Sequence, residues 1–375
     1  MTITIASLPA ALACAMQDRR EDGDSGSGDN TATTAKPTIV ARGLNGPVGV
    51  LVETDGTLWI SESGTGGDQV MQGGAPDSEP VRSIPWGLTA RLIRVGTDGT
   101  QTHVLSLPSM ITPEGPDGAG RIVVLDGTLY VTSGAWTDGM SIDRPSNMAA
   151  IVRVMHGNAS ELVTTWDIER RDNPDGAAIE TNPFDLTVGP DRALWLTDAA
   201  GNTLYRIDPA TRALELRAVF SAMTGPIPRG SREPDMTIQA VPTAVAFDAD
   251  GDMYVSLMPG VPYLPGSGRV VRVSQDGRVS DYATGLTSLT DLVTGPDGQL
   301  YAVSVGLFTE HGPVANTGAI VRIREGPVSD TILSGLSFPS TLAFANNGDA
   351  YVARNSIGPA GSGEVVRYAA LVSVR

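Results

Sequence analysis

The chain has 375 residues, a formal net charge of −16, and 44 glycines with 26 prolines. Such an acidic chain repels phosphate backbones, so we expect no nucleic-acid partner. The many glycines and prolines exclude a mainly helical protein and favour short strands joined by tight turns.

The N-terminal segment, residues 1–36, differs in composition from the rest of the chain. Residues 1–17 carry no charge, and a tether rich in Gly, Ser and Asp follows them at 22–34. The stretch around Cys14 resembles a lipoprotein cleavage site, although no basic residue precedes it. One interpretation is a signal whose start lies upstream of Met1, with a lipid anchor at Cys14. The alternative is a disordered tail. We expect export to an extracytoplasmic place (periplasm, cell surface or medium), and no later segment reaches the ~18 apolar residues of a membrane span.

Two motifs alternate along residues 37–375, which we predict to form one domain. The first is apolar–apolar–Arg–apolar, and its spacing near fifty residues is typical of a repeated sheet unit. The second is an Asp-Gly or Asn-Gly turn followed by apolar, aromatic and apolar residues, with Asp191 lacking the glycine. Each motif occurs six times, the arginines being Arg94, Arg153, Arg206, Arg272, Arg322 and Arg367.

The clearest unit, residues 239–286, shows how one repeat is built. A short strand at 244–247 turns through Asp248 to Gly251 into a second strand, and a proline-rich loop precedes the third at 269–273. A second turn leads to a fourth strand at 279–283. Four antiparallel strands make one propeller blade. The sequence therefore predicts an all-β, six-bladed β-propeller of four-stranded antiparallel blades. We expect the repeated arginine to have a structural role in each blade, with its guanidinium bound to an acidic side chain or to backbone carbonyl oxygens, and no catalytic role.

The N-terminal strand predicts how the ring closes. Residues 39–44 are similar to the fourth strands ending at Leu286 and Leu336, but no three strands precede them. We therefore expect this strand to complete the last blade, whose other strands lie between Ser340 and Tyr368. The alternative is that Ala370 to Arg375 provides that strand.

One face of the predicted propeller carries the longer loops between second and third strands, notably Ser63–Ala90 and Ser133–Ala149. Function on a repeat scaffold tends to lie where insertions gather, so we expect a small-molecule or protein ligand on this long-loop face. The aromatic side chains there either form an apolar rim or pack as small cores under the loops. The predicted ligand-binding residues are Glu62, Trp86, Trp136, Tyr263 and Phe308.

A channel metal is the second hypothesis for a site. Calcium needs several oxygen ligands that converge, and residues near the starts of the inner strands offer them. The candidates are Glu114, Asp117, Asn182, Asp185 and Asp291. Six-bladed gluconolactonase and regucalcin enzymes place the motifs Glu-Gly-Pro, Pro-Asn-Gly and Pro-Asp-Gly in separate blades. In this chain the stretch from Glu114 to Gly118 contains both Glu-Gly-Pro and Pro-Asp-Gly, so two of the motifs fall in a single blade. The alternative is that the carboxylates accept hydrogen bonds from nearby loop amides. We expect no cofactor, with calcium as the alternative.

The chain resembles the ScyD/ScyE family of six-bladed propellers over about residues 38–368. The resemblance lies in the stretches 43–47 and 59–67, in Asn182-Pro183-Phe184, and in Asp198-Ala199-Ala200-Gly201-Asn202. The chain departs from the family at Ser63 and at Val48, where the family tends to have Ala and Arg. The resemblance implies a propeller fold and export, and an aromatic pigment precursor as the ligand of the name-giving members.

Three functions follow as hypotheses. The first is an exported, non-catalytic propeller that binds a small molecule or a protein on its long-loop face. The alternative is a calcium-dependent lactonase or esterase of the gluconolactonase-like type. A third is a scaffold at the cell surface. The three histidines are predicted in outer strands or a peripheral loop, which disfavours a channel histidine acting as a base.

Overall fold

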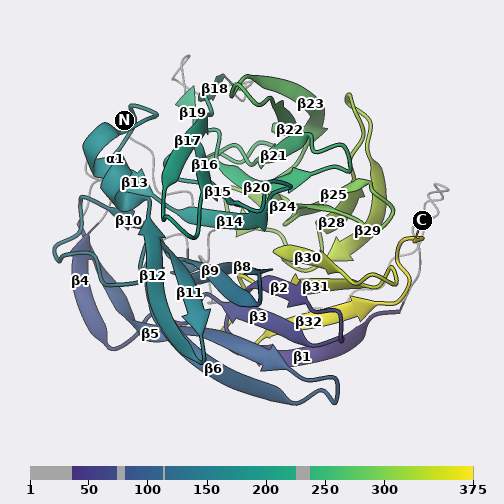
Figure 1. Cartoon of the computed structure of the whole chain (residues 1–375), viewed down its shortest axis with the longest axis horizontal. Helices are drawn as coiled ribbons and strands as arrows, with labels where there is room; N and C mark the ends of the chain where they lie inside the picture. The colour runs from purple at the N-terminus through teal and green to yellow at the C-terminus, as the bar shows by residue number, and fades with distance from the viewer. Residues whose placement is uncertain (1–35, 74–80, 113–114, 225–236, 375) are drawn as a thin grey trace.

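The computed structural model describes residues 36–73, 81–112, 115–224 and 237–374. These residues form six sheets of four strands or more, arranged around a central axis (Figure 1), and we call each sheet a blade. This arrangement confirms the predicted all-β propeller.

The blades follow one another along the chain. Blade 1 contains β2 (Pro47–Val52), β3 (Leu58–Glu62), β5 (Arg82–Val95), β6 (Gln101–Thr112) and β7 (Gly115–Asp117), with β4 (Gln69–Gly73) paired to β5. Blade 2 contains β8 (Ala119–Leu125), β9 (Thr128–Ser133), β11 (Ala150–Met155) and β12 (Asn158–Thr164). Blade 3 contains β14 (Pro183–Val188), β15 (Leu194–Asp198), β16 (Thr203–Ile207) and β17 (Leu214–Val219).

Blade 4 contains β20 (Pro242–Phe247), β21 (Met253–Leu257), β22 (Gly268–Val273) and β23 (Val279–Leu286). Blade 5 contains β24 (Leu289–Thr294), β25 (Leu300–Ser304), β28 (Gly318–Arg322) and β29 (Asp330–Leu336). Blade 6 contains β30 (Thr341–Phe344), β31 (Ala350–Arg354), β32 (Gly363–Tyr368) and the N-terminal β1 (Thr38–Leu44).

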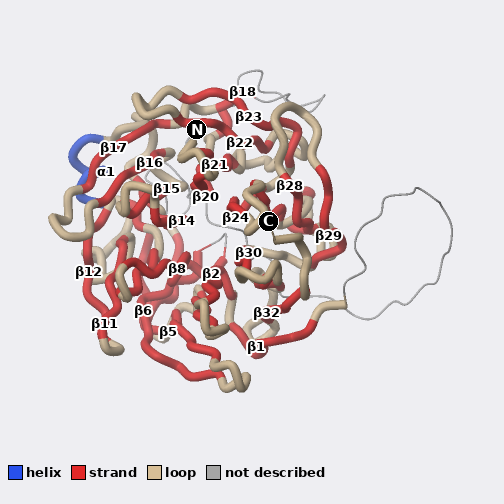
Figure 2. Tube along the Cα trace, turned by 45° about the vertical axis from the view of Figure 1, so that its right-hand side comes forward, coloured by secondary structure: helices blue, strands red, loops and turns tan. Residues whose placement is uncertain are grey.

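Within the described ranges, three two-stranded pairs and one helix lie outside the blades. The pairs are β10 (Trp136–Thr137) with β13 (Glu180–Thr181), β18 (Met223–Thr224) with β19 (Thr237–Ile238), and β26 (Phe308–Thr309) with β27 (Gly312–Pro313). The helix α1 (Trp166–Asp172) lies at the rim of the ring (Figure 2). Over the described ranges, no helix has the length and apolar character needed to cross a membrane.

The innermost strands form the wall of the central channel. Each contacts the next around a closed ring, in the order β2, β8, β14, β20, β24, β30 and again β2. The ring is closed as predicted, because β1 pairs with β32 in the register Ile39 to Val366 and Ala41 to Val365. The alternative, in which the C-terminal residues supply the outer strand of this blade, is wrong. Residues 369–374 form no strand, although Leu371 and Val372 are buried in the core of blade 6.

The two repeated motifs meet at the short hairpins on the face opposite the long loops. The hairpin acid accepts a hydrogen bond from the aromatic side chain that follows it, as Asp297 does from Tyr301 Oη (2.7 Å) and Asp191 from Trp195 Nε1 (3.1 Å). The repeated arginine then pairs with an acid of the same blade at Arg206, Arg272, Arg322 and Arg367. At these positions the structural interpretation of the arginine is confirmed.

The prediction of one long loop between Ser63 and Ala90 is in part wrong. β4 and the first half of β5 extend blade 1 as a hairpin over this stretch, so its backbone groups find partners within the sheet. Backbone polar groups in a folded chain need such partners, which explains why the insertion forms strands.

Candidate functional site in the channel

β-bulges set which side chains of the inner strands face the axis. The strand register shifts between Pro183 and Asp185, between Leu289 and Asp291, and between Ala119 and Ile122. A bulge re-aims the side chain beside it. In three different blades the bulge therefore places a charged residue toward the channel: Arg121, Asp185 and Asp291.

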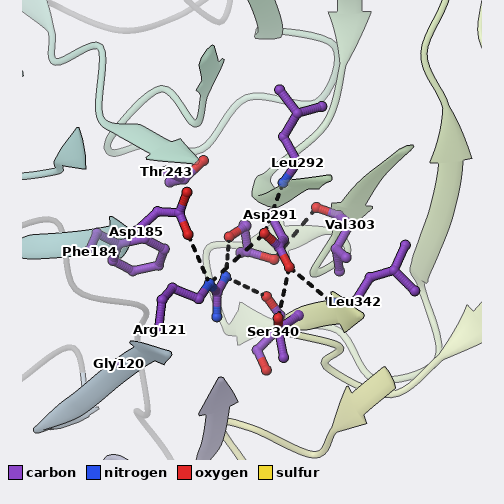
Figure 3. Close-up of polar contacts among 12 residues, drawn as sticks. Gly120, Arg121, Phe184, Asp185, Thr243, Asp291, Leu292, Val303, Ser340 and Leu342 are labelled. Atoms are coloured by element: carbon purple, nitrogen blue, oxygen red, sulfur yellow. Dashed lines mark hydrogen bonds and ion pairs between the residues drawn. The ribbon is translucent and has the colours of Figure 1, made fainter. Parts of the chain in front are cut away.

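Arg121 lies in the middle of the channel with its side chain buried (Figure 3). Its Nη2 donates to the carbonyl oxygens of Thr290 (2.5 Å) and Ser340 (2.8 Å), in blade 5 and immediately before β30 of blade 6. Its Nε lies 3.6 Å from Asp185 Oδ1 and 3.9 Å from Asp291 Oδ1. One guanidinium therefore joins the inner strands of blades 2, 3 and 5 to the start of blade 6.

Both channel aspartates also accept hydrogen bonds from the protein. Asp185 Oδ2 accepts from the backbone N–H of Val245 (2.8 Å), and Asp291 Oδ2 accepts from Thr341 Oγ1 (2.8 Å) and the backbone N–H of Leu342 (2.9 Å). Burial and the nearby Asp291 carboxylate raise the pKa of Asp185 to about 7, although Arg121 acts in the opposite direction. Two carboxylates facing one guanidinium leave one excess negative charge, and a proton on Asp185 removes it.

Arg121 lines two cavities, one on each side of it. The mouth cavity, on the long-loop side, has a volume of ≈ 50 Å³ and is lined by Val48, Ser63, Asp117, Asn182, Phe184 and Ile357 among others. The hairpin-side cavity has a volume of ≈ 330 Å³, and the later halves of the inner strands line it. The Arg121 guanidinium also stacks over Phe184, 5.5 Å from the ring centroid.

The predicted channel-metal residues come together only in part, and those that the structure describes do not gather as a group of three acidic side chains around one point. Asp185 and Asp291 converge, but on Arg121, whose positive charge would repel a divalent cation. Asp117 Oδ2 accepts from the backbone N–H of Ala135 (2.9 Å), and Asn182 is buried beside it at the mouth cavity. Glu114 lies outside the described residues. The described carboxylates, Asp117, Asp185 and Asp291, therefore match the hydrogen-bonded alternative, and a channel calcium ion stays a prediction.

Glu62 is fully buried and holds the start of blade 1 together. Its Oε1 accepts from Arg91 Nη2 (2.9 Å) and from the backbone N–H of Asn45 (2.7 Å). Arg91 Nε pairs with its other oxygen. Because the carboxylate has 0% exposure, it is not available to a ligand on the surface.

The aromatic rim predicted on the long-loop face is not formed by Trp136. This side chain is 2% exposed and packs with Met71, Met110 and Trp166, and Trp86 covers the same cluster as a half-buried residue. The methionines and the first residue of α1 close over the indole ring from separate segments. Of the two interpretations of the aromatic side chains, the small core packed under the loops therefore applies to Trp136 and Trp86.

Tyr263 and Phe308 form the second aromatic pair of this face. Their ring centroids are 4.7 Å apart, and they pack with Met258 and Val241. Phe308 is buried at 9% exposure, whereas Tyr263 is half-buried. As at Trp136, packing within the loops accounts for Phe308, and only Tyr263 keeps part of its ring at the surface.

Replacing Trp136 by phenylalanine tests this structural role. We expect the free energy of unfolding to fall by about 1–2 kcal/mol, because the smaller ring leaves part of the cluster unfilled. Urea denaturation measures the change. An unchanged stability with a lost ligand would contradict the assignment and restore Trp136 as a binding residue.

The histidines lie away from the channel, as expected. His103, His156 and His311 are all exposed, and neither cavity has a histidine in its lining. Across the described part of the chain, no three His, Cys, Asp or Glu side chains gather in a way that could hold a metal ion.

Sequence reasoning missed Arg121, the central residue of the site. The signal was present, because it is a charged residue within the otherwise apolar stretch 119–125 of an inner strand. A buried arginine in such a strand needs an acid nearby, and inner strands of other blades provide Asp185 and Asp291.

Comparison with known proteins agrees with the fold. No protein-family model matches the chain, and no curated protein does. Among solved structures, a gluconolactonase from Xanthomonas campestris is similar at 14% identity and a TM-score of 0.54, over 90% of this chain and 91% of that one. The PQQ-bound aldose sugar dehydrogenase from Streptomyces coelicolor is similar at 14% identity and a TM-score of 0.53, over 89% and 98%. A putative glucose dehydrogenase from Thermus thermophilus is similar at 16% identity and a TM-score of 0.52, over 88% and 99%. The chain is a β-propeller, and at these identities the likeness extends to the fold alone.

Proposed function

We propose that this protein is an exported, non-catalytic β-propeller that binds a small molecule at the mouth cavity of its long-loop face. The observation that carries the proposal is the Arg121 guanidinium between Asp185 and Asp291, below that cavity. The Arg121 guanidinium supplies a positive charge at the channel centre, where a metal ion would supply it in a lactonase. The lining of the mouth cavity contains no histidine that could act as a base.

The lining of the mouth cavity indicates the kind of ligand. Val48, Phe184 and Ile357 provide apolar contact, while Asp117 and Asn182 bring a carboxylate and an amide. Apolar walls with a few polar groups are typical of small-molecule sites. A volume of ≈ 50 Å³ admits only one end of a ligand, so the rest would lie across the long-loop face. A flat molecule with a hydrogen-bonding edge fits this description.

Membership of the ScyD/ScyE family and export are parts of the same proposal. The family rests on the motifs at 43–47, 59–67, 182–184 and 198–202, which lie in or beside the start of blade 1 and in blade 3. Export rests on the composition of residues 1–36. Cys14, the residue proposed for lipid attachment, lies outside the described residues.

Replacing Val48 by tryptophan should block the mouth cavity and weaken ligand binding by about tenfold or more, which is ~1.4 kcal/mol. Saturation-transfer NMR with a panel of small planar aromatic compounds measures the affinity. The matched control is Val328→Trp, at a residue that is 64% exposed and not among those that line the channel. The control should bind the compounds as the original protein does.

Two results would contradict the proposal. Equal binding by Val48→Trp and the original protein would place the ligand elsewhere. Hydrolysis of a lactone or ester panel that requires added CaCl2 and is lost in Asp291→Asn would favour the gluconolactonase-like alternative.

A further inference from the structure

The hairpin-side cavity is large enough to hold a small organic molecule. Its volume of ≈ 330 Å³ is about twice that of an apolar cavity that holds benzene. All six blades contribute to its wall, and aliphatic and aromatic side chains predominate among the residues that line it. Those of the wall that the argument uses are Val50, Val123, Val188, Val245, Val293 and Ala343, one from each blade, with Phe247 and Phe344. The volume and the wall therefore suit one aromatic ring with a short side chain.

The charged residues among the described ones that line this cavity are Arg121, Asp185 and Asp291. Both aspartates line the hairpin-side cavity and not the mouth cavity. The three side chains are only 7%, 8% and 4% exposed, so water screens their charges poorly. Two carboxylates and one guanidinium leave one excess negative charge when both aspartates are ionised. This end of the cavity therefore favours a ligand that carries a single positive charge.

The Arg121 guanidinium does not complete its pairing with the two aspartates. Its Nη2 donates to the carbonyl oxygens of Thr290 and Ser340, while its Nε is buried and has no hydrogen-bond partner. The closest carboxylate oxygens, Oδ1 of Asp185 and Oδ1 of Asp291, lie 3.6 and 3.9 Å from Nε (Figure 3), which is too far for direct hydrogen bonds. Buried charges are stable when they are balanced and hydrogen-bonded. A second cationic donor beside the two aspartates would therefore balance the charge.

We propose that the hairpin-side cavity binds a small primary amine in its protonated form, with an apolar body such as one aromatic ring. The ammonium group would lie beside Asp185 and Asp291, where its single charge balances the excess and its three N–H donors suit carboxylate oxygens. The apolar body would lie against the valine side chains and the rings of Phe247 and Phe344. A carboxylate ligand would add to the excess negative charge, and a neutral alcohol would leave it unbalanced. This inference does not depend on the ligand proposed for the mouth cavity.

Isothermal titration calorimetry of the full chain with three probes that share one aromatic ring tests the site. The probes are phenethylamine, phenethyl alcohol and hydrocinnamate, which carry an ammonium, a hydroxyl and a carboxylate group. EDTA keeps a channel calcium ion from competing, and pH 8 lies above the pKa of Asp185, which burial and Asp291 raise to about 7. Phenethylamine should bind about tenfold to a hundredfold more tightly than phenethyl alcohol, because hydrogen bonds to charged groups are the stronger ones. Hydrocinnamate should not bind.

Substitution of Asp185 makes the test specific to this cavity. Asp185→Asn should weaken phenethylamine binding by about tenfold and leave phenethyl alcohol binding unchanged. The matched control is Asp126→Asn, at a side chain that is 71% exposed, and it should bind both probes as the original protein does. Equal affinities of the original protein for the amine and the alcohol would overturn the proposal, whether or not Asp185→Asn folds. A loss of amine binding in Asp117→Asn but not in Asp185→Asn would also overturn it, because Asp117 lines the mouth cavity.

Discussion

Replacing Arg121 by methionine should lower the free energy of unfolding by about 3–5 kcal/mol at pH 8. The substitution removes the guanidinium but keeps most of the side-chain volume, so its main effect is to leave Asp185 and Asp291 buried without a counter-charge. The carbonyl oxygens of Thr290 and Ser340 also lose their donor. An unpaired buried charge costs far more than the pair contributes, which is why this change should be large.

Urea denaturation followed by circular dichroism measures the change, with the midpoint falling and the slope unchanged. The matched control is Arg272→Met. Arg272 pairs with Asp252 on the hairpin face, where the two side chains are 51% and 39% exposed. Exposed pairs contribute ~1 kcal/mol or less, so the control should differ little from the original protein. Equal losses in the two variants would contradict the central role of Arg121.

The stability of the original protein should fall as the pH rises from about 4 to about 7, relative to that of Asp185→Asn. The pKa of Asp185 is raised to about 7 in the folded chain, chiefly by burial and by Asp291, and it is near 3.9 in an unfolded one. A raised pKa means that the folded state binds the proton more tightly, so its stabilising effect is complete below pH 4 and is lost by pH 7. The difference should be on the order of 2–4 kcal/mol.

The measurement is the free energy of unfolding of both proteins at several pH values, taken as a difference so that other titrating groups cancel. Asp126→Asn serves as the control, because the Asp126 side chain is 71% exposed. Its curve should run parallel to that of the original protein. A parallel curve for Asp185→Asn as well would show that Asp185 stays ionised across this range.

The repeats made the fold predictable from the sequence. Alternating turns and arginine motifs fix the strand order within each unit, because an Asp-Gly turn between apolar runs leaves few alternatives to a hairpin. The ring closure was also predictable, since the stretch ending at Leu44 has the pattern of a fourth strand without the three that should precede it. Local patterns sufficed because each blade uses the same short-range rules.

The site was less predictable, because it depends on contacts between blades. The same alternation that identifies a strand does not say which side chain a bulge turns toward the axis, and so Asp185 and Asp291 were predicted without their partner Arg121. The burial of Trp136 depends on Met71, Met110 and Trp166, which come from three separate segments. The short helix α1 also escaped prediction, because seven residues are too few to show a helical period.

The pairing of β1 with β32 sets the order in which the molecule can be completed. Thr38 pairs with Arg367, so β1 meets its neighbour only after the strands of all the blades between them have been synthesised. Until then blade 6 is incomplete and the ring of inner strands is open at one seam. Contacts between such distant parts of a chain form slowly. The ring of blades therefore closes only after β32 has been made, and a nascent chain stalled before β32 would expose unpaired strand edges to its neighbours.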